Sequence, residues 1–126
     1  MNAISRSHGV SHFKVAMYLE KKFPSDLYEI SIDEDIEQDE GHLKVRPDIL
    51  IRDKKDDIVL VAEIAVNSLK KDLKGVKAIY EMFEIKDYLV VDCNHNTIYH
   101  FGLKDGKYEE LQGSNLSDEL EKNVFE

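Results

Sequence analysis

The most constraining feature of the sequence is a single acidic residue inside an apolar segment. Residues 58–66 read Ile-Val-Leu-Val-Ala-Glu-Ile-Ala-Val, and Glu63 is the one charged position among them. An apolar run of this length predicts a strand that is buried on both faces. A carboxylate in such a strand is costly unless it is paired or binds a metal. Glu63 is therefore either half of a structural ion pair with Lys or Arg or part of a functional site.

A second acid, Asp48, is placed to face Glu63. Residues 47–52 predict a short strand, and the polar residues after it predict a hairpin turn. Opposite residues of a hairpin have a constant sum of residue numbers, and a turn centred just after Lys55 pairs Asp48 with Glu63. Their Cβ atoms would lie about 4.5–5.5 Å apart. Two such carboxylates repel each other unless a cation or a proton lies between them, and oxygen ligands of this kind suit Mg²⁺.

A lysine-rich helix is predicted after this hairpin, over residues 69–85. Its apolar stripe comprises Leu69, Leu73, Val76, Tyr80 and Phe83, spaced 4-3-4-3. Beside the stripe, Lys70, Lys74 and Lys77 follow a 4-3 spacing. These lysines form either a solvated flank of the helix or a cationic edge near the carboxylates, able to hold phosphate or polarise a water.

The remaining segments predict a mixed central sheet flanked by helices, an α/β fold in one domain spanning residues 1–126. The other predicted elements are a helix at 11–23, strands at 27–33, 87–93 and 97–103, a hairpin turn at 105–106 and a terminal helix around Leu116, Leu120 and Val124. The order is then α-β-β-β-α-β-β-α. In the first helix we expect Val10, Phe13 and Met17 to face the core, flanked by Ala16, Leu19 and Phe23. The acidic residues 33–40 predict an exposed loop or strand end.

These motifs resemble the PD-(D/E)xK nuclease superfamily. The residues that carry the resemblance are Pro47-Asp48, Glu63-Ile64-Ala65, Asp72, Lys77, Tyr80 and the segment Asp-Tyr-Leu-Val-Val-Asp at 87–92. Within the superfamily, the sequence is similar to the putative restriction endonuclease domain family, in which the lysine has moved from the strand to the following helix. The likeness covers residues 8–110.

The resemblance implies a restriction-endonuclease-like core and metal-dependent hydrolysis of nucleic-acid phosphodiester bonds, with DNA as the expected partner. Asp48 and Glu63 would hold Mg²⁺, or Mn²⁺ as a substitute, with the backbone carbonyl of Ile64 as a further ligand. Lys77, or Lys74 in its place, would orient the attacking water and stabilise the transition state. Superfamily enzymes often act as dimers, so a homodimer is compatible with this interpretation.

Two positions depart from the family pattern. Ala65 stands where the strand lysine would be, and Val76 stands four residues after Asp72, where the helix lysine is expected; Lys77 is one residue further on. The alternative is therefore a catalytically inactive nuclease-fold protein that acts as a DNA-binding or protein-interaction module. A third interpretation is an unrelated small α/β domain whose Glu63 belongs to a structural ion pair.

Composition limits the partners. The formal net charge of −9 disfavours a charge-driven nucleic-acid binder, but the acid excess is uneven: residues 31–40 carry six acids and no base, and residues 91–126 carry eight acids and three bases. The one cysteine, Cys93, excludes an intramolecular disulfide and a Cys-rich zinc site. With no apolar run near 20 residues and no signal-peptide pattern, we expect a soluble, cytoplasmic protein without a membrane partner.

Three other polar residues have the types that metal sites use. His8 and His12 have the i, i+4 spacing of a metal-binding pair, but no third ligand is visible nearby, and we expect them at the surface near the helix start. Glu20 of the same helix is an alternative metal ligand, and we expect it to be solvated.

Overall fold

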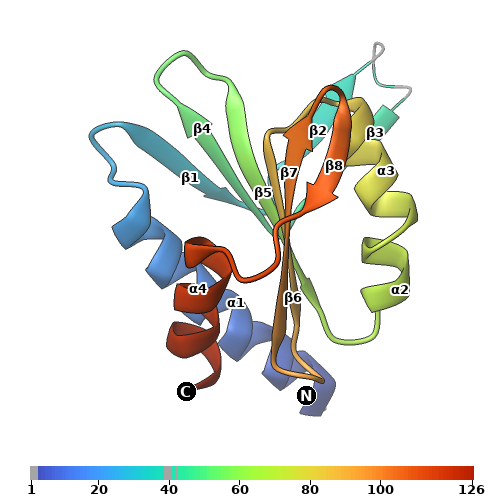
Figure 1. Cartoon of the computed structure of the whole chain (residues 1–126). Helices are drawn as coiled ribbons and strands as arrows, with labels where there is room; N and C mark the ends of the chain where they lie inside the picture. Colours follow the sequence, from blue (N-terminus) through green and yellow to red (C-terminus); the bar gives the residue numbers. More distant parts are fainter. Residues whose placement is uncertain (1–2, 39–40, 42) are drawn as a thin grey trace.

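The protein is built around one mixed six-stranded sheet (Figure 1). The computed structural model describes residues 3–38, 41 and 43–126. The sheet order is β1-β4-β5-β6-β7-β8, with bounds β1 Tyr28–Ile32, β4 Ile49–Asp53, β5 Ile58–Ala65, β6 Asp87–Asp92, β7 Thr97–Lys104 and β8 Lys107–Glu110. Strands β5 and β6 are parallel, and the other neighbours are antiparallel. The predicted mixed sheet is confirmed, with β8 completing the hairpin expected at residues 105–106.

Helices cover both faces of the sheet, as predicted. Helices α1 (Ala3–Lys22) and α4 (Asn115–Phe125) lie on one face, and α2 (Leu69–Asp72) and α3 (Gly75–Met82) lie on the other (Figure 1). In the part of the chain that the structure describes, no helix has the length and apolar character needed to cross a membrane.

The acidic segment 33–40 contains a strand that the predicted order lacks. Strand β2 (Ile36–Gln38) pairs with β3 (Leu43–Val45) in a separate two-stranded sheet, and Ile36 is only 6% exposed. Arginines neutralise the acids beside it, since Arg46 binds Asp35 and Arg52 binds Glu34. Residues 39 and 40 lie outside the described residues.

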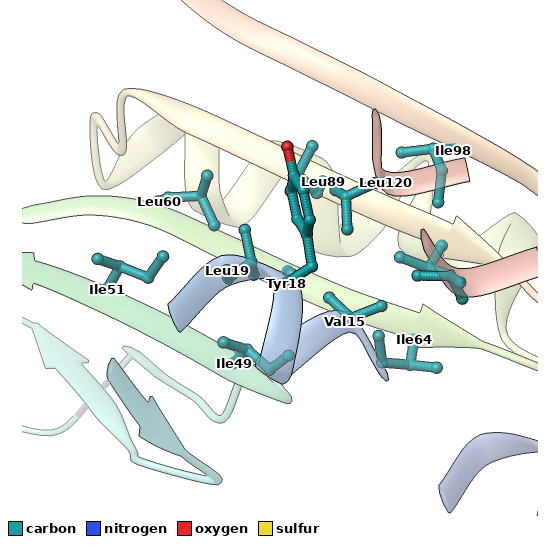
Figure 2. Packing of buried hydrophobic residues seen from close by; sticks show 13 residues of the cluster. Val15, Tyr18, Leu19, Ile49, Ile51, Leu60, Ile64, Leu89, Ile98 and Leu120 are labelled. Carbon is teal, nitrogen blue, oxygen red and sulfur yellow. The ribbon is translucent and has the colours of Figure 1, made fainter. Parts of the chain in front are cut away.

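Side chains of the buried strands alternate between two cores. On β5, Leu60, Ala62 and Ile64 pack under α1 and α4, as Figure 2 shows for Leu60 and Ile64. Val61 and Ala65 pack under α3 with Val76 and Tyr80. Because successive side chains of a strand point to opposite faces, Glu63 lies on the α2–α3 face.

The face of α1 that packs on the sheet differs from the expected one. Val15 and Leu19 are fully buried, whereas the expected core residues Val10, Phe13 and Met17 are 48%, 65% and 45% exposed. Leu19 was expected to flank the apolar face, and Ala16 and Phe23 also pack against this core. The helix therefore packs on the sheet through the stripe that contains Val15 and Leu19 and not through the stripe that contains Val10 and Met17. The helix has apolar residues on both stripes, and packing against the sheet determines which of them is buried.

The helix expected over residues 69–85 is broken in two. Lys74 has φ −125° and ψ −86°, outside the helical region, and α3 begins at Gly75. The apolar stripe still faces the sheet, since Val76, Tyr80 and Phe83 are buried and Leu69 and Leu73 pack against them.

The register of the β4–β5 hairpin is the predicted one on the side that carries the acids. Ile49 pairs with Ala62 and Leu50 with Val61, so that each pair has the expected sum of 111. The register shifts by one residue after Ile51, toward the turn. Asp48 and Glu63 are the next two positions after the Ile49–Ala62 pair. Glu63 lies on the same face of β5 as Val61, which packs under α3.

The packed face of α1 can be tested by truncation. We expect Leu19→Ala to lower the free energy of unfolding by about 2–5 kcal/mol, because it opens a cavity at a fully buried position. The matched change Met17→Ala should cost less than about 1 kcal/mol at its exposed position. Urea unfolding of both variants measures the difference, and equal losses would contradict the observed packing.

Candidate active site

One surface pocket collects the acids that the sequence singles out. The pocket has a volume of about 510 Å³ and lies at the end of β5, beside α2. Its lining includes His8, Asp48, Glu63, Ile64, Lys71 and Asp72. Elements far apart in the sequence thus bring three carboxylates, a lysine and a histidine to one open cavity.

Asp48 is held by backbone contacts on both sides. Its Oδ2 accepts a hydrogen bond from the Ile64 N–H at 2.7 Å. Its carbonyl oxygen accepts from the Asp33 N–H at 3.2 Å and lies 3.1 Å from the Nε2 of His12. These contacts fix both the backbone and the carboxylate of Asp48 at the edge of the pocket.

The Ile64 carbonyl is directed toward the same side of the strand. In a strand, the N–H and C=O of one residue point to the same neighbour, and the Ile64 N–H points to Asp48. The next carbonyl along, that of Ala65, accepts from the Cys93 N–H at 2.9 Å on the opposite side. The backbone oxygen predicted as a further metal ligand therefore faces the Asp48 side of β5.

Glu63 is partly buried and carries a perturbed carboxyl group. Its Oε1 accepts a hydrogen bond from the Tyr80 hydroxyl at 2.9 Å. Burial, together with the negative charge of Asp48, raises the pKa of Glu63 from 4.5 to about 8, and the Tyr80 hydrogen bond offsets only part of this rise. The charged form of Glu63 is thus disfavoured by its burial and by Asp48, the neighbour that the register places opposite it.

A third acid, Asp72, closes the pocket from α2. It is 3% exposed and accepts a hydrogen bond from the Ser68 hydroxyl at 2.7 Å. Burial raises its pKa; the Ser68 hydrogen bond and the adjacent Lys71 partly offset this. Asp72 appeared in the sequence only as part of the family likeness, and the structure places it on the pocket wall.

The lysine in the pocket is not one of the two predicted lysines. The Lys77 Nζ lies 4.5 Å from the centre of the Phe101 ring, over β7. Lys74 is exposed at the break between α2 and α3 and does not line the pocket. Lys71, which sequence reasoning missed, does line it. The signal that could have identified Lys71 is its position directly before Asp72. The prediction of Lys74 and Lys77 assumed one continuous helix, whereas the helix breaks at Lys74.

The two histidines of α1 are partly exposed and lie beside Asp48, a neighbour that the i, i+4 spacing did not predict. The Nε2 of His8 is 3.5 Å from Asp48 Oδ2, and the His8 and His12 rings meet edge to face with centroids 5.7 Å apart. Glu20, by contrast, is exposed and lines a different pocket of about 610 Å³ near β1. That larger pocket contains none of the other predicted ligands.

The donor set fits a magnesium-type ion. Among the described residues there is no group of three or more His, Cys, Asp or Glu side chains already placed to hold a metal ion together. Mg²⁺ does not require one, because proteins bind it through one or two carboxylates, with waters and substrate phosphates completing the shell. Burial and, second, repulsion by Asp48 raise the pKa of Glu63, so a cation between the two carboxylates would stabilise the pair.

The family comparison agrees with this geometry. The family model described as "Uma2: Putative restriction endonuclease" matches residues 14–126. The chain belongs to this Uma2 family. The restriction-endonuclease-like resemblance drawn from the Asp48 and Glu63 motifs is therefore confirmed, and the chain is nuclease-like. No curated protein matches the sequence.

A solved structure shares the fold of this Uma2 chain. It is described as the crystal structure of a putative nuclease belonging to DUF820 from Anabaena variabilis ATCC 29413. The likeness has a TM-score of 0.55 at 14% sequence identity and covers 94% of this chain and 80% of the other. At this identity the similarity shows the fold, and it agrees with the mixed sheet flanked by helices.

The perturbed pKa of Glu63 predicts a pH-dependent stability. The unfolded chain loses the Glu63 proton near pH 4.5, whereas the folded protein keeps it until about pH 8. In EDTA, the free energy of unfolding should therefore fall as pH rises across this window, by on the order of a few kcal/mol. Glu63→Gln should lack this component. Urea unfolding at several pH values measures it.

The exposed Glu109 provides the control for this measurement. Glu109→Gln should follow the wild-type pH dependence, because this side chain is exposed on the edge strand. Parallel wild-type and Glu63→Gln curves would contradict the proposed environment of Glu63.

Proposed function

We propose that this chain is a metal-dependent endonuclease that hydrolyses phosphodiester bonds of nucleic acid, with DNA as the substrate we expect. The observation that carries the proposal is the convergence of Asp48 and Glu63 from adjacent strands on an open pocket beside Lys71. Family membership supports the nuclease class, and the donor set supports the ion.

Asp48 and Glu63 would hold Mg²⁺ or Mn²⁺, with the Ile64 carbonyl as a further ligand. A divalent ion there would neutralise charge on the phosphate and lower the pKa of a bound water. The Ile64 N–H fixes the direction of the Asp48 carboxylate, and the Tyr80 hydroxyl fixes that of Glu63. Both acids thus accept hydrogen bonds from neutral donors, and a bound dication would favour the ionised form of Glu63.

Lys71 is the lysine that we assign to the reaction, in place of Lys77 or Lys74. Its ammonium group would donate hydrogen bonds to a phosphate oxygen and stabilise the negative charge that grows in the transition state. Its neighbour Asp72, held in place by the Ser68 hydroxyl, lines the same pocket. Lys77 instead contributes a cation–π contact with Phe101.

A specific observation favours the alternative, an inactive nuclease-fold module that binds DNA or protein. Val76, which stands where the family likeness places a lysine, is 7% exposed and packs with Tyr80 in the core under α3. That position therefore supplies no amine to the pocket. The endonuclease and the inactive module therefore differ in whether Lys71 takes the role of the lysine that Val76 replaces.

Metal binding should be visible as stabilisation. A Mg²⁺ or Mn²⁺ concentration 100 times the dissociation constant should raise the free energy of unfolding by about 2.7 kcal/mol. Asp48→Asn should remove this gain because it removes one of the two carboxylates. Thermal or urea unfolding with and without the ion measures it, with Asp118→Asn on the exposed side of α4 as control. The same gain in Asp48→Asn would place the ion elsewhere.

Cleavage distinguishes the enzyme from the inactive module. With Mn²⁺ or Mg²⁺, we expect nicking of plasmid or cutting of single-stranded DNA, abolished in Glu63→Gln with its circular dichroism unchanged. Lys71→Ala should lower the rate by about 10²–10⁴, as loss of a charge-stabilising or proton-handling group does. Lys77→Ala should retain the rate within a few fold. Absence of cleavage by the wild-type protein, with the ion bound, would support the inactive module.

A further inference from the structure

The N-terminal helix brings an imidazole into the carboxylate pocket. His8 lines the pocket, its Nε2 lies 3.5 Å from Asp48 Oδ2, and its side chain is 36% exposed. The likeness to the nuclease superfamily assigned ligand roles only to oxygen atoms of Asp48, Glu63 and Ile64. A nitrogen donor beside them changes the chemistry of the site.

We propose that His8 is an additional metal ligand next to Asp48, so that the site takes a first-row transition-metal dication in preference to Mg²⁺. This inference rests on the proposed function, since it concerns the ion that Asp48 and Glu63 would hold.

The geometry of the His8–Asp48 pair suits adjacent ligands. In octahedral coordination with bonds of about 2.1 Å, neighbouring ligand atoms lie about 3 Å apart. The observed separation of 3.5 Å between Nε2 and Oδ2 is about 0.5 Å larger than this. Because the described side chains do not already form a three-ligand group, a bound ion would have to draw His8, Asp48 and Glu63 together by side-chain rotation. Without a metal, the same pair is an ordinary contact between a histidine and a carboxylate.

His12 is a positioning residue in this arrangement. Its Nε2 lies 3.1 Å from the Asp48 carbonyl oxygen, so this nitrogen is occupied by the backbone. The edge-to-face contact between the two rings holds His8 toward the carboxylate. His8 and His12 therefore do not act as a chelating pair of their own, although their i, i+4 spacing would allow one.

The choice of ion follows from ligand chemistry. Mg²⁺ strongly prefers oxygen ligands, whereas an imidazole nitrogen favours transition metals such as Co²⁺, Ni²⁺ and Zn²⁺. Adding one nitrogen to two carboxylates should therefore raise the affinity for Co²⁺ much more than the affinity for Mg²⁺. The ratio of these two affinities measures the contribution of His8.

Calorimetric titration of the untagged full chain with Co²⁺ and with Mg²⁺ tests the proposal. We expect His8→Gln to lower the Co²⁺ affinity by about tenfold or more and to leave the Mg²⁺ affinity within about threefold. Pulsed electron paramagnetic resonance of bound Mn²⁺ should show coupling to a ¹⁴N nucleus in the wild type and lose it in His8→Gln.

His95→Gln is the matched control, because His95 also pairs with an aspartate, at 2.8 Å, but outside this pocket. It should leave both affinities and the ¹⁴N coupling unchanged. Equal losses of Co²⁺ and Mg²⁺ affinity in His8→Gln, or retained ¹⁴N coupling, would overturn the assignment of His8 as a ligand. Co²⁺ binding that survives Asp48→Asn and is lost in His12→Gln would also overturn it, in favour of a two-histidine chelate.

The outcomes separate this inference from the proposed function. If Glu63→Gln and Asp48→Asn abolish ion binding while His8→Gln has no effect, the carboxylate site stands and the role of His8 is wrong. If neither carboxylate variant affects ion binding, the metal-dependent function itself is wrong.

Discussion

The hydrogen bond from the Ile64 N–H to the Asp48 carboxylate is the contact on which the candidate site depends. The residue pairing between β4 and β5 ends at Ile49, opposite Ala62. Strand β5 continues past that point, and a side-chain oxygen of Asp48 takes the place of the missing backbone partner. The same contact therefore satisfies a strand end and directs a carboxylate toward Glu63.

The position of Glu63 follows from the alternation of side chains along β5. Its neighbours Ala62 and Ile64 face the α1–α4 core, so Glu63 faces the α2–α3 layer, where Tyr80 meets it. Tyr80 is fully buried and reaches the acid from within an apolar cluster. A structural ion pair is therefore not the arrangement that the described residues provide, because the group that Glu63 contacts is a neutral hydroxyl.

The hairpin register and the two carboxylates could be predicted from the sequence because they depend on local patterns. Alternation and the polar turn determine which residues of the hairpin face each other, and the Asp48–Glu63 face follows. That Lys71 rather than Lys74 or Lys77 lines the pocket could not be predicted, because the helix break at Lys74 is not visible in the sequence pattern. The contact between His8 and Asp48 could not be predicted for a related reason: the two residues are 40 positions apart, and no local pattern records their proximity.

The charges in the pocket determine whether a negatively charged phosphodiester can bind there. Three carboxylates, Asp48, Glu63 and Asp72, line it with Lys71 as the permanent cation. With its acids ionised, such a pocket repels a phosphodiester, because one ammonium group does not offset three negative charges. A dication between Asp48 and Glu63 would cancel the net negative charge left by three carboxylates and one ammonium group, and it would favour the ionised form of Glu63. Ion binding and nucleic-acid binding are therefore expected to be coupled at this site, which accounts for a nuclease-like pocket in a chain whose net charge is −9.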